Sequence, residues 1–282
     1  MLIEMYFLEE ILTQIYEFIF NFSKYLIYHT MPRYFIEFSY DGTNYHGLQK
    51  QPNSETIQEL LETNMKKYLG FKSNLTLAGR TDTGVHARQM FAHFDIDDEF
   101  EQNKFCKSLN MMLPRDICIE SLYLVRDDSH ARFDATSRTY EYFVNSKKNA
   151  FSYRFAYYLK ENLDVEKMNI SCNRLLNHVD FKCFSKSNTD VKTYNCDIIF
   201  AKWNVLENGL KFKITANRFL RNMVRSIVGT MIEIGRLKIS DSDFQEILNS
   251  RNRSEAGFSV PASGLFLTDV SYEEKFIKIW KK

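Results

Sequence analysis

The chain has 282 residues, 44% of them hydrophobic, with 24 Phe and 16 Tyr. This composition excludes intrinsic disorder and allows one large domain or two ordinary ones. The 37 Lys and Arg nearly balance the 36 Asp and Glu, so a site for a polyanion must be a local patch. The 5 cysteines form no CxxC pair, which favours free thiols in the cytoplasm and no metal site.

The first 30 residues are apolar and aromatic but are interrupted by acidic residues. No apolar run reaches the about 18 to 20 residues of a membrane span. A basic leader with a small-residue cleavage site is also missing from the pattern. Met31, Pro32 and Arg33 then read like a fresh protein start. We therefore predict that translation begins at Met31; the alternative is an amphipathic helix docked on the body or on a membrane surface.

The next segments mix short strands with amphipathic helices. Residues 33–42 are rich in aromatic side chains and end in Asp-Gly, which predicts a strand and a turn. A helix follows, with Thr56 and Glu59 as a capping box and Gly70 as its end. Further strands are expected at 73–80, 89–96 and 117–126, and a helix at 103–113.

The second half repeats this mixture. Asp164 is expected to cap a helix that carries Met168, Cys172, Leu175, Leu176 and Val179. Strands are predicted at 139–146, 210–216 and 265–272, a long helix at 218–236, and a short capped helix at 240–248.

These elements predict an α+β fold with mainly antiparallel sheets. The boundary between the two halves is expected within residues 127–138. The predicted organisation is an N-terminal extension at 1–31, a first domain at 32–127 and a second domain at 128–282.

A dense motif, "AGRTDTGVHARQ", covers residues 78–89. Asp82 is flanked by Arg80 and Arg88, which would keep its carboxylate ionised, and glycines on either side let the backbone approach a ligand. The plain alternative is a turn aspartate. His86, four residues on, is more often a hydrogen-bonding scaffold than a base and could orient the turn.

An aspartic protease is a second alternative, because Asp-Thr-Gly is its signature. That chemistry needs two carboxylates that share a proton, and the chain has a single Asp-Thr-Gly and no Asp-Ser-Gly. The residues before Asp82 are polar instead of apolar, which also disfavours this class.

Three arginines fall on one side of the predicted helix at 218–236: Arg218, Arg221 and Arg225. The alternative is a solvated face. However, cations in the first two turns lie at the positive end of the helix dipole, which destabilises the helix by about 0.3–1 kcal/mol for each terminal charge. An anionic partner, either a phosphate or Asp82, would offset this cost.

Residues 129–143 form a third cluster, with His130, Arg132 and Arg138 among three aromatics, Phe133, Tyr140 and Tyr142. The alternative is sheet packing. The functional interpretation is a base-stacking platform beside phosphate-binding arginines.

Five segments in order resemble the TruA family of tRNA pseudouridine synthases. They are "FSYDGTNYHGLQKQ" (38–51), "AGRTDTGVHA" (78–87), "HARFDATSRTYEY" (130–142), "NRFLRNMVRSIVG" (217–229) and "PASGLFLTDVSY" (261–272). By this resemblance Asp82 is the catalytic aspartate, Tyr140 stacks on the target base, Arg225 is the basic partner of Asp82, and Leu267 lines the uracil pocket. Arg80 resembles the arginine that takes the place of the flipped nucleotide.

The resemblance implies two RRM-like, ferredoxin-like α+β domains whose sheets meet across a basic cleft. It also implies a cytoplasmic homodimer that acts on the anticodon stem-loop of tRNA, with no membrane association, cofactor or metal. Uridine would be isomerised to pseudouridine after leaving the RNA stack. Whether Asp82 attacks C1′, attacks C6 or abstracts a ribose proton stays open. The alternative is a non-catalytic tRNA-binding protein on the same fold.

Two positions depart from the family pattern. Leu48 stands where a tryptophan is usual, and Lys192 where many relatives carry arginine, which costs the bidentate fork on a phosphate. The expected catalytic residues are Asp82, Tyr140 and Arg225. The expected substrate-binding residues are Arg80, His86, Arg88, Tyr140, Lys192, Arg218, Arg221 and Leu267.

Overall fold

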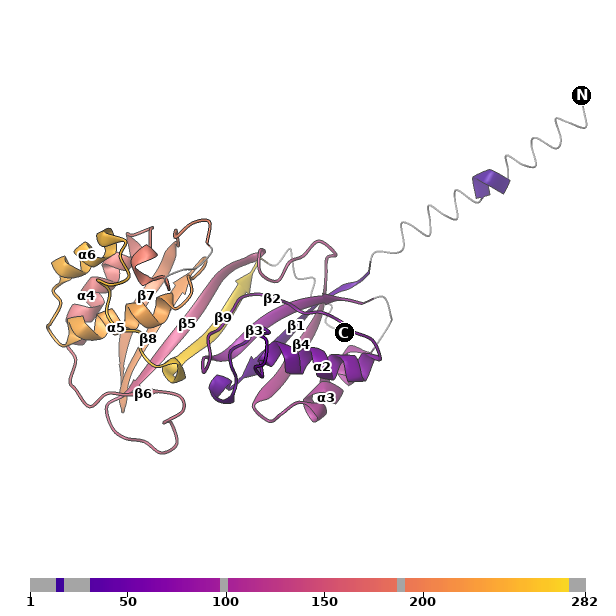
Figure 1. Cartoon of the computed structure of the whole chain (residues 1–282), viewed down its shortest axis with the longest axis horizontal. Helices are drawn as coiled ribbons and strands as arrows, with labels where there is room; N and C mark the ends of the chain where they lie inside the picture. The colour runs from indigo at the N-terminus through magenta and orange to yellow at the C-terminus, as the bar shows by residue number, and fades with distance from the viewer. Residues whose placement is uncertain (1–13, 18–30, 97–100, 187–190, 274–282) are drawn as a thin grey trace, which may run out of the picture.

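The computed structural model describes residues 14–17, 31–96, 101–186 and 191–273 (Figure 1). Within them a single sheet runs through the molecule in the strand order β4-β1-β3-β9-β5-β8-β7, with β2 added to β3 and β6 to β5. The strands are β1 (Arg33–Tyr40), β2 (Thr76–Leu77), β3 (His86–Asp95), β4 (Ile117–Val125), β5 (Ala135–Asn145), β6 (Tyr157–Tyr158), β7 (Ile198–Leu206), β8 (Gly209–Ala216) and β9 (Leu265–Tyr272).

The helices fall into two groups along the sheet (Figure 1). They are α2 (Ile57–Leu69), α3 (Gln102–Met112), α4 (Val165–Leu176), α5 (Met223–Gly235) and α6 (Asp241–Ser250). The expected α+β class and mainly antiparallel sheet are confirmed, since among the described strands only β3–β9 and β5–β6 pair in parallel.

Two hydrophobic cores accompany the two helix groups. Phe38 and Phe105 lie in the first, and Trp203 and Phe244 in the second. The last strand, β9, lies between β3 and β5 and so joins the two halves into one sheet. The boundary at 127–138 and the two-domain division stay predictions.

The predicted helix at 218–236 is wrong at its start, because α5 begins at Met223. Asn222 adopts a left-handed conformation (φ 65°), and the carbonyl of Arg221 accepts a hydrogen bond from the Lys186 N–H. A continuous helix is therefore interrupted there. Arg218 and Arg221 both precede the helix and only Arg225 lies in it, so the three arginines do not form a helical stripe.

At the other helix ends, some of the predicted capping residues are confirmed and others are wrong. Asp164 caps α4 through the Lys167 N–H, Gly70 ends α2 at φ 82°, and Ser240 forms a capping box on α6. Thr56 is the N-cap residue of α2, but its side chain makes no capping bond, so the predicted capping box is wrong. Val179 lies beyond the end of α4.

The strand predicted at 73–80 shrinks to Thr76–Leu77, because Ala78 is the last residue to bond β3 before the chain leaves the sheet. Strand β7 was not expected, although "IIFAKWNVL" is rich in β-branched and aromatic residues.

Most of residues 1–30 lie outside the described residues, so the predicted start at Met31 stays a prediction. In the part of the chain that is described, no helix is long and apolar enough to cross a membrane.

Candidate active site

Asp82 lies in a tight loop between β2 and β3. The Ala78 N–H bonds the Phe91 carbonyl at the start of this loop, and the Val85 N–H bonds the Asp82 carbonyl at its end. Gly84 takes a left-handed φ of 76°, which favours glycine. The loop is thus shaped by its own backbone, and it leaves the Asp82 carboxylate partly exposed to solvent.

A second segment, residues 40–48, contacts this loop at Thr81. The Leu48 N–H donates to the Thr81 carbonyl at 3.3 Å, and the buried Tyr40 hydroxyl lies 2.8 Å from Thr81 Oγ1. At Gly47 (φ 93°) a Cβ would stand 2.8 Å from the Thr81 oxygen. Leu48 itself is fully buried in the first core, so the departure from the family tryptophan lies at a core position.

Two arginines flank the Asp82 carboxylate. Arg221 Nε and Arg225 Nη1 each lie 3.7 Å from one of its oxygens. The Arg225 Nε donates to the Val260 carbonyl at 2.7 Å, while Arg221 is largely exposed. Arg225 is therefore held in place, and Arg221 is free to contact a ligand.

Tyr140 and Leu267 lie side by side on neighbouring strands of the sheet. They are register partners on β5 and β9, and Ala87 on β3 is the partner of Leu267 on its other side. The Tyr140 ring meets the Phe219 ring edge to face at 5.1 Å. Burial raises the pKa of Tyr140 to about 12, with Arg138 opposing and Asp82 adding to the rise. The phenol is therefore neutral near neutral pH.

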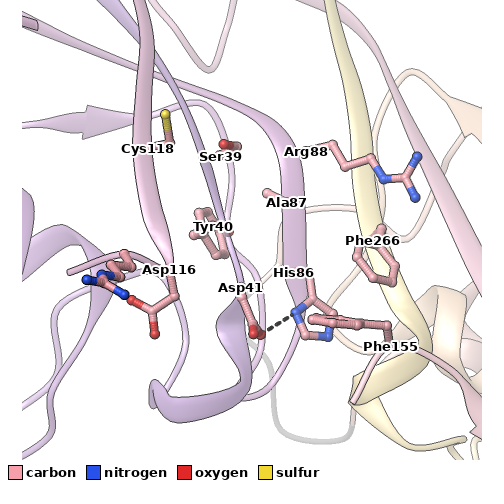
Figure 2. A pocket seen from close by; sticks show the side chains of 11 residues that line it. Ser39, Tyr40, Asp41, His86, Ala87, Arg88, Asp116, Cys118, Phe155 and Phe266 are labelled. Carbon is pink, nitrogen blue, oxygen red and sulfur yellow. Dashed lines mark ion pairs between the residues drawn. The ribbon is translucent and has the colours of Figure 1, made fainter. Parts of the chain in front are cut away.

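His86 and Arg88 lie on the opposite face of the sheet from Leu267, because neighbouring strand residues alternate. Figure 2 shows His86 against Asp41, with Phe155 and Phe266 beside it and Arg88 above. The Arg88 guanidinium lies 5.4 Å from the Phe266 ring centroid. Contact of Arg88 with RNA stays a prediction.

The His86 ring is buried and bridges three segments. Its Nδ1 accepts from the Gly42 N–H at 3.0 Å, and its Nε2 lies 3.1 Å from the Ser263 carbonyl and 3.2 Å from that of Arg154. Burial lowers the pKa of His86, although Asp41 acts in the opposite direction. The same Nδ1 lies 3.0 Å from Asp41 Oδ1. These contacts to three segments suit the expected orienting role.

The other predicted binding residues are Arg80, Lys192 and Arg218, and all three lie outside the helices of the described residues. Arg80 and Lys192 are exposed, and Arg218 is half-buried just after β8. Their contact with substrate stays a prediction.

Arg138 has a different place from the phosphate-binding role suggested by its sequence. Its guanidinium donates to four carbonyls, those of Ala78, Arg132, Ala135 and Asn217. Tyr142 is fully buried and donates to the Pro261 carbonyl. The prediction that Arg138 binds phosphate is therefore wrong, and so is the prediction that Tyr142 belongs to a base-stacking surface. Long-range packing decides their role, and the local sequence carries no signal of it.

A metal centre has no candidate in the described part of the chain, where no cluster of three His, Cys, Asp or Glu could hold an ion.

Comparison with known proteins decides the family. A sequence model described as tRNA pseudouridine synthase matches residues 37–134 and 172–273. The tRNA pseudouridine synthase A of Bacteroides fragilis is 45% identical over 251 residues, which cover 88% of this chain and 100% of the relative. The chain belongs to the tRNA pseudouridine synthase family.

Other relatives of the family agree. The tRNA pseudouridine synthase A of Parabacteroides distasonis is 44% identical over 250 residues, covering 88% of this chain and 99% of the relative. That of Caldicellulosiruptor bescii is 39% identical over 235 residues, covering 83% and 96%. The segments matched by the family model contain Asp82, Arg225 and Leu267, whereas Tyr140 lies between them.

Proposed function

We propose that this chain isomerises uridine to pseudouridine in the anticodon stem-loop of tRNA, with Asp82 as the essential carboxylate. The observation that carries the proposal is the arrangement of Asp82 between Arg221 and Arg225, in a chain of this family. An exposed turn aspartate without a role would not need two arginines brought from a segment more than a hundred residues away.

The reaction breaks the bond between N1 and C1′ of uridine and forms one between C5 and C1′. The uracil rotates between these events, C5 loses its proton, and N1 gains one. Attack of Asp82 on C1′, attack on C6 and abstraction of a ribose proton all require an ionised carboxylate. Arg221 and Arg225 lie 3.7 Å from the two oxygens of that carboxylate, where they can pair with its charge.

The base would occupy the space beside Tyr140 and Leu267. The tyrosine ring offers a stacking surface, and the apolar leucine leaves the uracil free to turn, since it makes no hydrogen bonds to it. The neutral Tyr140 hydroxyl can donate a hydrogen bond or a proton during the transfer.

The tRNA backbone would contact the basic residues Arg80, Lys192, Arg218 and Arg221, with His86 orienting the loop. Arg88 would meet RNA only on the opposite face of the sheet, beside Phe266. The resemblance to the family supports a cytoplasmic homodimer in which one tRNA contacts both subunits. Sedimentation of the purified chain with and without tRNA tests that assembly.

Tritium release tests the proposed reaction, because C5 loses its hydrogen. The purified chain is incubated with tRNA that carries 5-tritiated uridine. Release of tritium into water, with pseudouridine found in the digested tRNA, supports the proposal. Binding of tRNA without release would instead favour the non-catalytic tRNA-binding alternative.

A further inference from the structure

A depression of about 270 Å³ adjoins the loop that carries Asp82. Its walls come from two segments: residues 75–80, which end in Arg80, and residues 130–133, which include Arg132 and Phe133. Gln49 and Gln58 complete it, and none of its lining residues is acidic. Cations, amides and an aromatic ring are the groups that bind unpaired RNA.

Phe133 presents its ring to solvent, with 75% of the residue exposed. The ring is nevertheless held in place, because it packs on His130 at 4.2 Å between centroids. The N–H groups of Arg132 and Phe133 both donate to His130 Nδ1, at 3.1 and 3.3 Å. An exposed ring on a fixed turn loses little entropy on stacking, so it makes a favourable platform for a base.

Arg138 ties both walls of the depression to each other. It donates to the Ala78 carbonyl at 3.2 Å on one wall and to the Arg132 carbonyl at 2.6 Å on the other. A Cβ added at Gly79 would meet nothing within 4 Å, so there is open space above the backbone there. The depression is therefore coupled to the loop that carries Asp82, three residues further on.

We propose that an unpaired nucleotide next to the target uridine stacks on Phe133, with its phosphate beside Arg132. This inference rests on the proposed function and adds a second base contact to it. Aromatic side chains stack on any base, so Phe133 fixes the position of the RNA and does not choose its sequence.

Substitution of Phe133 separates stacking from mere apolar packing. Phe133→Leu keeps an apolar side chain but removes the ring, so tRNA affinity should fall about 5- to 100-fold. The loss should appear mainly in KM. Phe133→Tyr keeps the ring and should bind like the parent. Phe200→Leu is the matched control, because Phe200 is an exposed aromatic on β7 away from the depression; it should leave KM unchanged.

Phe133→Trp gives a direct optical readout. Its indole fluorescence should be quenched when saturating tRNA is added, because a stacked base quenches indole. Val205→Trp, placed at a residue 72% exposed on β7, should show no matching change. This measurement does not depend on catalysis.

The outcomes separate this inference from the proposed function. If the parent chain forms pseudouridine but Phe133→Leu keeps the parent KM and Phe133→Trp is not quenched, stacking at Phe133 is overturned alone. If the parent chain releases no tritium, the proposed function fails whatever Phe133 does.

Discussion

At the scale of single residues, the Tyr140 ring and its hydroxyl have separable roles. Tyr140→Phe keeps the ring, so tRNA affinity should stay within about two-fold, whereas kcat should fall because the hydroxyl is lost. Tyr140→Ala should reduce both. Steady-state kinetics with filter binding measures the split, and two fully active variants would show that Tyr140 only packs the sheet.

The Tyr140 pKa also has a consequence for the pH profile. A phenol with a pKa of about 12 stays protonated well above its ordinary value, which is about 10. The kcat of the parent should therefore not fall near about pH 10 through ionisation of Tyr140. Near that pH, the pH profiles of the parent and of Tyr140→Phe should have the same shape. A limb at that pH that disappears in Tyr140→Phe would contradict this assignment.

The two arginines beside Asp82 should also differ in their effects. Arg225 is anchored to the Val260 carbonyl, so Arg225→Ala should lower kcat more than affinity. Arg221 is exposed, so Arg221→Ala should weaken tRNA binding and reduce the salt slope by about 0.7–0.9 for a lost phosphate contact. Binding measured across salt concentrations gives the slopes; an unchanged slope for Arg221→Ala would mean a solvated side chain.

At the scale of elements, the segment at 40–48 holds the loop that carries Asp82. Gly47 and Gly70 both have left-handed φ, but only a Cβ at Gly47 meets the Thr81 carbonyl, and one at Gly70 meets nothing within 4 Å. Both Gly→Ala variants should lose about 1–2 kcal/mol of unfolding free energy for that conformation. Gly47→Ala should in addition displace the loop and lower kcat at least about ten-fold.

Gly70→Ala is the control for Gly47→Ala, because both variants place alanine at a left-handed position. Thermal melting reports the stability of both variants, and tritium release reports their activity. Equal activities for Gly47→Ala and Gly70→Ala would show that the contact with Thr81 does not position Asp82.

Local sequence signals predict the elements well where the cause is local. Asp164, Ser240 and Gly70 mark helix ends because their own side chains or backbone angles form the cap. The start of α5 could not be predicted from local sequence. Asn222 has a left-handed backbone there, and its side-chain amide donates to Ser259 Oγ, which is distant in the sequence. Residue chemistry leaves a phosphate and Asp82 open as partners of the arginines, and only the resemblance to the family pairs Arg225 with Asp82. Periodicity alone wrongly places Arg218 and Arg221 on the helix of Arg225.

At the scale of the whole molecule, buried histidines should make stability depend on pH. Burial lowers the pKa of His93 from 6.5 to about 4, with Arg33 and His130 adding to the shift. The unfolded chain binds the proton more tightly, so stability is full above about pH 6.5 and is lost as the pH falls. This one residue should remove about 2 kcal/mol of unfolding free energy between about pH 7.5 and about pH 5.

His93→Asn tests that dependence. The amide oxygen can replace Nδ1 as the acceptor for the Ala131 N–H and does not titrate. Urea unfolding of both chains at the two pH values should show a smaller loss for the variant. Equal losses would assign the pH dependence to other groups, such as His86 and His130, whose pKa values are also lowered by burial.

One sheet brings Asp82 from the first half of the chain against Arg221 and Arg225 from the second. Asp82→Asn keeps the shape and hydrogen-bonding capacity of the side chain but removes its charge. Single-turnover tritium release from 5-tritiated uridine in tRNA is the most direct test. We expect tRNA affinity within a few-fold of the parent and no detectable release; release above about 1% of the parent rate would contradict an essential carboxylate at Asp82.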